Sequence, residues 1–149
     1  MSDRNNPGDA DARIDHLGIA VRSLDEALKF YEGQLGLGVS LRENVAVEKV
    51  NVAMLPLGSS MPGSSQGEPR IELIEAAAPD SVIGKFIEKR GEGLHHVALR
   101  VPDLTSTVER LRSSGARILN EPREGAGGHL YVFVHPSSTG GVLLELIQA

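Results

Sequence analysis

Asp15-His16-Leu17-Gly18-Ile19-Ala20-Val21 is repeated eighty residues later as His95-His96-Val97-Ala98-Leu99-Arg100-Val101. In each copy a histidine opens an apolar run, and a later apolar run that holds one carboxylate closes the copy. The closing runs are Arg70-Ile71-Glu72-Leu73-Ile74 and Leu144-Glu145-Leu146-Ile147. Such an internal repeat relates equivalent positions by a pseudo-twofold axis, so it predicts two half-sites that each supply one His and one Glu.

The composition argues against several classes of partner. The chain has 149 residues, 40% of them hydrophobic, which is enough for one domain with a packed core. A formal net charge of -5 argues against nucleic acid, which binds clustered Lys and Arg. The absence of cysteine excludes a disulfide and a thiolate metal site. No stretch has the length of a membrane span or the pattern of a signal peptide, so we expect a soluble cytoplasmic protein without a membrane partner.

The local patterns predict a fold of class α+β. Residues 1–12, rich in Ser, Asp, Asn, Pro and Gly, are expected to be a disordered tail. Residues 13–149 are expected to form a single domain of two tandem βαβββ modules, whose curved mixed sheet surrounds a metal-binding cleft. The first module (about 13–78) has predicted strands at 14–21, 39–42, 45–57 and 70–75, with a helix after a capping box at Ser23–Glu26. A helix at about 80–90 leads to the second module (about 92–149), with strands at 96–101, 116–119, 130–135 and 142–147 and a helix after Asp103.

Strand alternation places the carboxylates on one face. Glu72 and Glu145 each have aliphatic neighbours on both sides, and we expect these neighbours to face the helix-packed core. The carboxylates then lie on the concave face, where an ionised group needs a partner or a cation. Taken singly, a strand His is more often a buried structural residue and a strand Glu usually faces solvent. The duplication favours a divalent metal held by His16, Glu72, His96 and Glu145, and this ligand set alone does not choose among Zn, Co, Mn, Ni and Fe.

At these residues the chain resembles the vicinal oxygen chelate (glyoxalase) superfamily, and within it the methylmalonyl-CoA epimerase family. The similarity covers 14–149 and is carried by Ile14–Val21, by Glu92-Gly93-Leu94-His95-His96-Val97-Ala98, and by His135-Pro136 with Gly140–Leu146. It implies the same four metal ligands, a divalent ion that is most often Co2+ (with Zn2+, Mn2+ or Ni2+ as alternatives), an acyl-CoA substrate and a homodimer. The implied reaction interconverts (2R)- and (2S)-methylmalonyl-CoA through an enolate.

Inversion at one carbon requires two acid/base groups, one on each side of a planar intermediate. The resemblance makes Glu145 one of them. For the other, some members of the family carry a Glu at the position that aligns with Asn51, and an amide cannot transfer a proton. We therefore predict Glu48 as the second acid/base, although an exposed structural role fits it equally well. A further departure is Ser137, where many relatives have Lys. Two other functions stay open: a glyoxalase-I-type lactoylglutathione lyase, and a non-catalytic protein of the superfamily that binds a small molecule.

Overall fold

The computed structural model describes residues 11–58 and 69–149. The tail predicted at 1–12 therefore lies outside the described residues, except for its last two. The chain separates into two compact units, one of residues 16–96 and one of residues 97–149 together with 11–15. Within the described ranges, no helix is long and apolar enough to cross a membrane.

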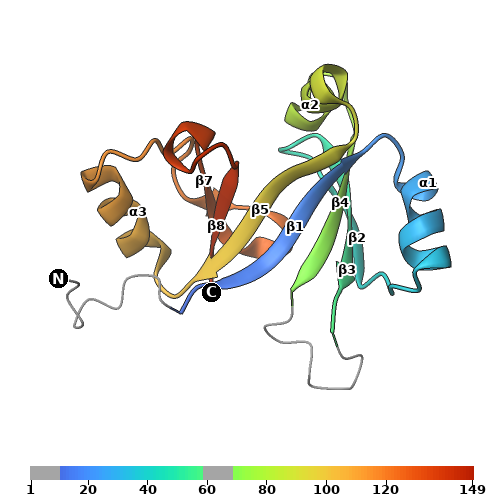
Figure 1. Ribbon diagram of the computed structural model, residues 1–149, viewed down its shortest axis with the longest axis horizontal. Helices are drawn as coiled ribbons and strands as arrows, with labels where there is room; N and C mark the ends of the chain where they lie inside the picture. Colours follow the sequence, from blue (N-terminus) through green and yellow to red (C-terminus); the bar gives the residue numbers. More distant parts are fainter. Residues whose placement is uncertain (1–10, 59–68) are drawn as a thin grey trace. The chain divides into compact units, whose positions relative to one another are not determined.

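The unit of residues 16–96 contains four strands in the order β2-β3-β4-β1 (Figure 1). Strand β1 runs parallel to β4, whereas β2 with β3 and β3 with β4 are antiparallel pairs. Helix α1 continues directly into one turn of π-helix. The elements are β1 (Arg13–Val21), α1 (Leu24–Leu28), the π-helical turn (Lys29–Gln34), β2 (Leu41–Val45), β3 (Val50–Pro56), β4 (Arg70–Ala76) and α2 (Val82–Arg90).

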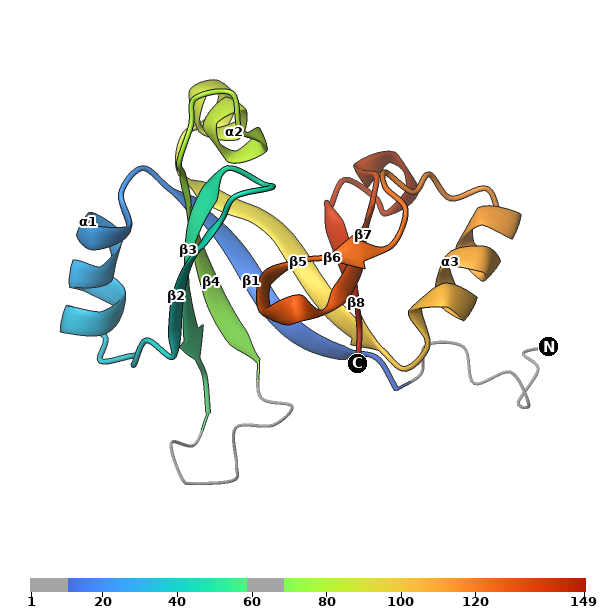
Figure 2. The same ribbon diagram turned by 180° about the vertical axis from the view of Figure 1, so that it is seen from behind.

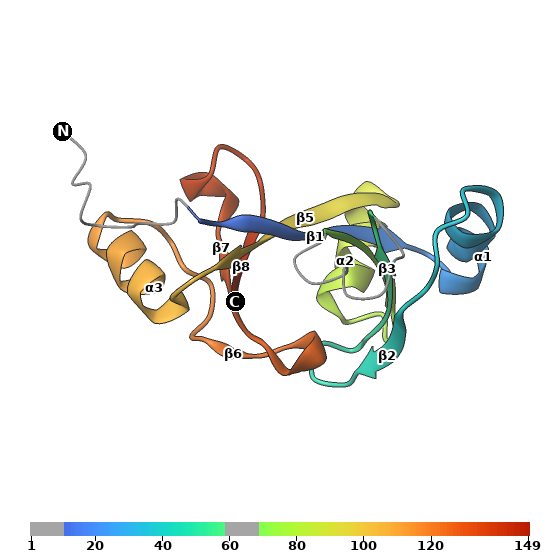
Figure 3. The ribbon, with the colours of Figure 1, turned by 90° about the horizontal axis from the view of Figure 1, so that it is seen from below.

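Helices α1 and α2 lie on opposite faces of this sheet (Figure 3). Leu24 and Leu28 of α1 pack on one face, against Ala53, Leu55 and Leu73. Ile83 of α2 packs on the other face, against Ala20, Val50, Val52 and Ile74. Glu72 alternates with Leu73 and pairs with Met54, so its side chain belongs to the face that α2 partly covers.

The second unit repeats this plan around β5 (Figure 2). Its strand order is β5-β8-β7-β6, with β5 parallel to β8 and the other pairs antiparallel. Helix α3 packs through Leu104 and Val108 on the face that carries Leu146. Glu145 alternates with Leu146 and therefore belongs to the face opposite α3. The elements are β5 (Gly93–Val101), α3 (Leu104–Ser113), β6 (Arg123–Glu124), a 3-10 turn (Ala126–Gly128), β7 (Leu130–Val134), a second 3-10 turn (Pro136–Ser138) and β8 (Leu144–Gln148).

The duplication extends to the helix caps. The predicted cap residue Ser23 accepts a hydrogen bond from the backbone N–H of Glu26, and Asp103 accepts one from the N–H of Ser106. In each half, a side chain near the end of the last strand also caps the helix of that half. Glu75 Oε1 accepts from the N–H of Leu24 at 3.1 Å, and Gln148 Oε1 accepts from the N–H of Leu104 at 2.8 Å. These bonds satisfy N–H groups that have no partner inside the helix.

The predicted element order βαβββ is confirmed in each half, but two boundaries differ from the prediction. The first hairpin turns at 46–49 rather than at 43–44, because Leu41–Val45 pairs with Val50–Met54 and buries Val45 against Val50 and Val52. Lys49 closes the turn with a φ of 56°, and the apolar residue Val47 is exposed at its tip. The strand predicted at 116–119 is reduced to a single bridge between Ile118 and Val134, and the short strand β6 provides the edge pairing instead.

Candidate metal centre

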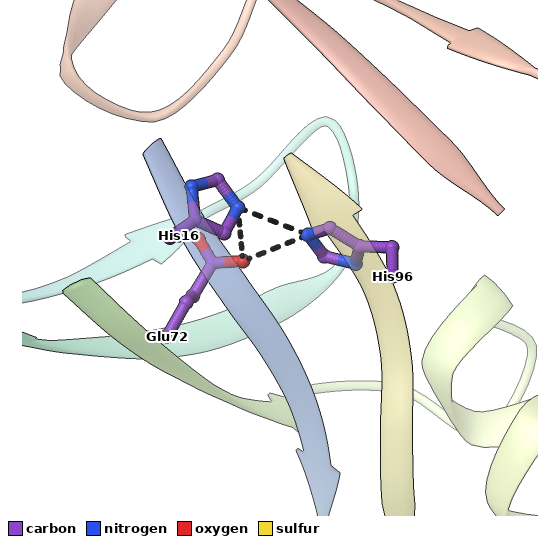
Figure 4. Close-up of side chains that lie close together, drawn as sticks. All are labelled: His16, Glu72 and His96. Carbon is purple, nitrogen blue, oxygen red and sulfur yellow. Dashed lines mark hydrogen bonds and ion pairs between the residues drawn. The ribbon is translucent and has the colours of Figure 1, made fainter. Parts of the chain in front are cut away.

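Three side chains of the unit of residues 16–96, which includes the first four residues of β5, converge on a small volume (Figure 4). His16 comes from β1, Glu72 from β4 and His96 from β5, and their ligand atoms all lie within 4.8 Å of one another. The Nε2 atoms of the two histidines are 3.0 Å apart. Each Nε2 lies 3.4 Å from Glu72 Oε1. The repeat and the strand alternation predicted these three residues as ligands, and the structure brings them together.

The triangle of donor atoms has the size that a divalent transition metal requires. For metal–ligand bonds of about 2.1 Å, two ligands at a right angle lie about 3.0 Å apart and two at the tetrahedral angle about 3.4 Å apart. The observed separations of 3.0, 3.4 and 3.4 Å match these values. Two imidazoles and one carboxylate form a facial set that leaves further coordination positions open. The residues present therefore fit a bound divalent ion.

The cluster is enclosed by protein. The side chains of His16 and His96 are each 4% exposed and that of Glu72 is 9% exposed. Burial by itself would raise the pKa of Glu72, but hydrogen bonds and charge interactions with His16 and His96 outweigh it and hold the pKa well below its usual value. The carboxylate is thus ionised, which is the form that binds a metal.

Two neighbours set the position of the His96 ring. Gly18 lies on the same face as His16, and a Cβ atom added to Gly18 would come within 2.1 Å of His96 Cε1. The imidazole therefore occupies space that only glycine leaves free. On its other edge, His96 Nδ1 hydrogen-bonds to His95 Nδ1 at 2.8 Å, and the ring of Phe86 from α2 contacts His95 edge to face. This arrangement directs His96 Nε2 toward Glu72, and such supporting contacts typically orient metal ligands.

The other residues predicted for the site are not members of this three-residue cluster. Glu145 is on β8 in the second unit, so its role as fourth ligand and acid/base stays a prediction. Glu48 lies in the turn between β2 and β3 instead of in the predicted strand, and it is not part of the three-residue cluster. Asn51 belongs to the face opposite Glu72, where its side-chain amide donates to Glu75 at 3.1 Å. Asn51 therefore points away from the cluster, and its amide does not take the place of an acid/base group on the face that carries Glu72.

Comparison with known proteins assigns the family. Residues 15–133 match the family model of the Glyoxalase/Bleomycin resistance protein/Dioxygenase superfamily. Because the match spans most of the chain, the protein belongs to this superfamily. The members to which it is similar include methylmalonyl-CoA epimerases.

Three relatives show this similarity over nearly the whole chain. The mitochondrial methylmalonyl-CoA epimerase of Homo sapiens is 34% identical over 139 residues, which cover 92% of this chain and 74% of the human protein. The ethylmalonyl-CoA/methylmalonyl-CoA epimerase of Cereibacter sphaeroides is 33% identical, with 91% and 97% covered. A variant of Streptomyces coelicolor methylmalonyl-CoA epimerase, solved in complex with 2-nitronate-propionyl-CoA, is 37% identical with a TM-score of 0.84, covering 92% and 96% of the two chains. The glyoxalase fold that the resemblance implies is thereby confirmed.

Proposed function

We propose that the protein is a metal-dependent methylmalonyl-CoA epimerase, which interconverts the (2R) and (2S) isomers through an enolate. The observation that carries this proposal is the buried cluster of His16, Glu72 and His96, found in a chain that is similar to named epimerases over nine-tenths of its length. A non-catalytic binding protein has no need for three converging metal ligands with this spacing. The cluster therefore favours an enzyme over a passive binding module.

His16, Glu72 and His96 would hold the ion, and Glu145 is the predicted fourth ligand. A divalent ion bound there supplies Lewis acidity, which lowers the pKa of the C–H bond between the thioester and the carboxylate of the substrate. The buried side chains of His16, Glu72 and His96 would exclude bulk water from the ion, and three protein ligands would leave it able to bind the substrate oxygens. The proton is then removed on one side of the reacting carbon and returned on the other, which requires two acid/base side chains.

Two finer assignments complete the proposal. Co2+ is the proposed native ion because the resemblance to the epimerases favours it, and the ligand set equally accommodates Zn2+, Mn2+ or Ni2+. A cytoplasmic homodimer is proposed on the same resemblance and on the composition. Elemental analysis of the protein purified from cells, together with its mass in solution, tests the ion and the dimer.

The test of the function is proton exchange. The protein is stripped of metal, reloaded with Co2+ and incubated in D2O with (2R)- or (2S)-methylmalonyl-CoA. We expect NMR to show loss of the C2 proton and formation of the other isomer, and both should stop when a chelator removes the ion. A metal-loaded protein that leaves both isomers unchanged contradicts the proposal. Activity on methylglyoxal and glutathione in place of methylmalonyl-CoA would assign the lactoylglutathione lyase function instead.

A further inference from the structure

Glu43 lies on the same sheet face as Glu72. In β2 it pairs directly with Val52 of β3, which pairs with Ile74 of β4, and cross-strand partners point to the same face. Ile74 is two residues beyond Glu72, so the row that contains Glu43 is the next row along this face. The packing agrees, because Val45, two residues after Glu43, packs against Val50 and Val52.

The neighbours of Glu43 in β2 confirm its direction. Arg42 makes an ion pair with Asp25 of α1, and Asn44 donates to Asn51, which belongs to the α1 face. Since side chains alternate along a strand, the side chain between Arg42 and Asn44 points away from α1. Glu43 thus joins the face that carries the metal cluster.

One carboxylate oxygen of Glu43 has no hydrogen-bond partner among the described residues. Its Oε1 is buried and accepts no hydrogen bond from any residue that the structure describes. Buried polar atoms are nearly always hydrogen-bonded, so an exception requires an explanation. The rest of its row on β3, β4 and β1 consists of Val52, Ile74 and Ala20, which offer no donor side chain. A ligand on this face would supply the missing hydrogen.

We propose that Glu43 is the second acid/base of the epimerase, in place of Glu48. The inference rests on the proposed function and names one of its catalytic residues. Glu43 takes the C2 proton from one side of the substrate: the C–H bond breaks, its electron pair passes into the enolate, and the proton forms an O–H bond on the carboxylate. A proton delivered from the opposite side completes the inversion, and Glu145 is the predicted donor. In the reverse direction Glu43 returns the proton to carbon, so no other reactant is consumed.

The separation suits this role. With strands about 4.8 Å apart and about 6.8 Å per two residues, the Cα atoms of Glu43 and Glu72 lie about 12 Å apart in a flat sheet. Both side chains rise from the same face of the sheet. Glu43 is therefore near enough to reach a substrate held at the cluster, and far enough away that it is not itself a ligand.

Isomer-specific proton exchange tests the assignment. The Glu43→Gln variant keeps the shape of the side chain and loses its basicity. We expect epimerisation to fall by about 100- to 10,000-fold, the usual contribution of a general base. The C2 proton of one isomer should no longer exchange with D2O, while that of the other isomer still exchanges through the opposite base. Affinity for Co2+ should stay within twofold of wild type, and Glu88→Gln, an exposed change on α2, serves as the matched control.

Each result decides the matter. Loss of exchange for one isomer in Glu43→Gln, with Co2+ binding intact, supports the inference. Retention of exchange for both isomers, or an equal loss for both, overturns it while the proposed function stands. The isomer-specific loss in Glu48→Gln instead of Glu43→Gln would overturn it in favour of the sequence prediction. A wild-type protein that exchanges neither isomer overturns the proposed function and this inference together.

Discussion

Replacing Gly18 by alanine is expected to disable the metal centre from a position that is not a ligand. The added Cβ would lie 2.1 Å from His96 Cε1 and 2.5 Å from both ring nitrogens. Carbon atoms in contact are about 3.5 Å apart, so the ring must retreat by about 1.4 Å, the difference between 3.5 and 2.1 Å. Metal–ligand distances tolerate only about 0.2 Å. The shift therefore removes His96 from coordination.

We expect Gly18→Ala to weaken Co2+ binding by at least about 100-fold, which corresponds to about 2.7 kcal/mol. Overpacking should also lower the free energy of unfolding of the metal-free protein by about 1–3 kcal/mol. Titration calorimetry measures the first quantity and urea denaturation the second, so a folded variant that has lost only metal binding can be recognised. In the control Gly33→Ala, the new Cβ meets nothing nearer than 3.9 Å and affinity should be unchanged. A folded Gly18→Ala protein with wild-type Co2+ affinity would refute the steric explanation.

The other predictions concern the ligands and the scaffold. His96→Ala should abolish tight Co2+ binding, whereas His95→Ala should weaken it by about 10- to 100-fold, because only an orienting hydrogen bond is lost; equal losses would contradict this division. Leu73→Ala, at a side chain with 0% exposure, should cost about 2–5 kcal/mol in urea denaturation, and a cost below 1 kcal/mol would be inconsistent with a packed core. Glu75→Ala should cost about 0.5–2 kcal/mol because the N–H of Leu24 loses its acceptor, and the same loss in a Glu75→Gln variant would argue against capping. Chelation should lower the melting temperature, since an ion at 100 times its Kd contributes about 2.7 kcal/mol; an unchanged transition would mean that the folded state binds no ion.

The three clustered ligands were predictable because the evidence for them is local and repeated. Alternation along a strand separates Glu72 from its aliphatic neighbours, and this depends on no distant contact. The pairing of β1 with β4 then places Gly18 directly beside Glu72, which brings His16 within one row of the carboxylate. The eighty-residue repeat pairs His16 with His96, which selected His96 rather than His95. The structure places His96 in the cluster and His95 in a hydrogen bond to it.

The sequence did not predict which residue of β2 shares the sheet face of Glu72. The apolar run from Val45 onward predicts one long strand, which puts Glu48 in the sheet and Glu43 in a turn. The structure reverses these positions, because a cross-strand pairing of five residues outweighs the local preference and leaves Val47 exposed at the hairpin tip. A shift of hairpin register depends on contacts with β3, and those contacts cannot be derived from the β2 sequence alone. The signal that identifies Glu43 is its unpartnered buried oxygen, which is visible only in three dimensions.

The two halves agree in the row that contains Glu72 or Glu145 and differ in the next row. Glu72 corresponds to Glu145, each directly paired with a small residue, Gly18 or Ala98. Two residues further on, the cross-strand row of the first half ends on Glu43. The equivalent row of the second half ends on Arg123, whose guanidinium donates to the hydroxyl of Tyr131 at 2.8 Å. Both halves thus carry a glutamate in the first of these rows, while the next row carries a carboxylate in one half and a cation in the other. Since inversion needs two proton-transferring groups and a guanidinium stays protonated, Arg123 is not suited to be the second group, and Glu145 stays the predicted partner of Glu43.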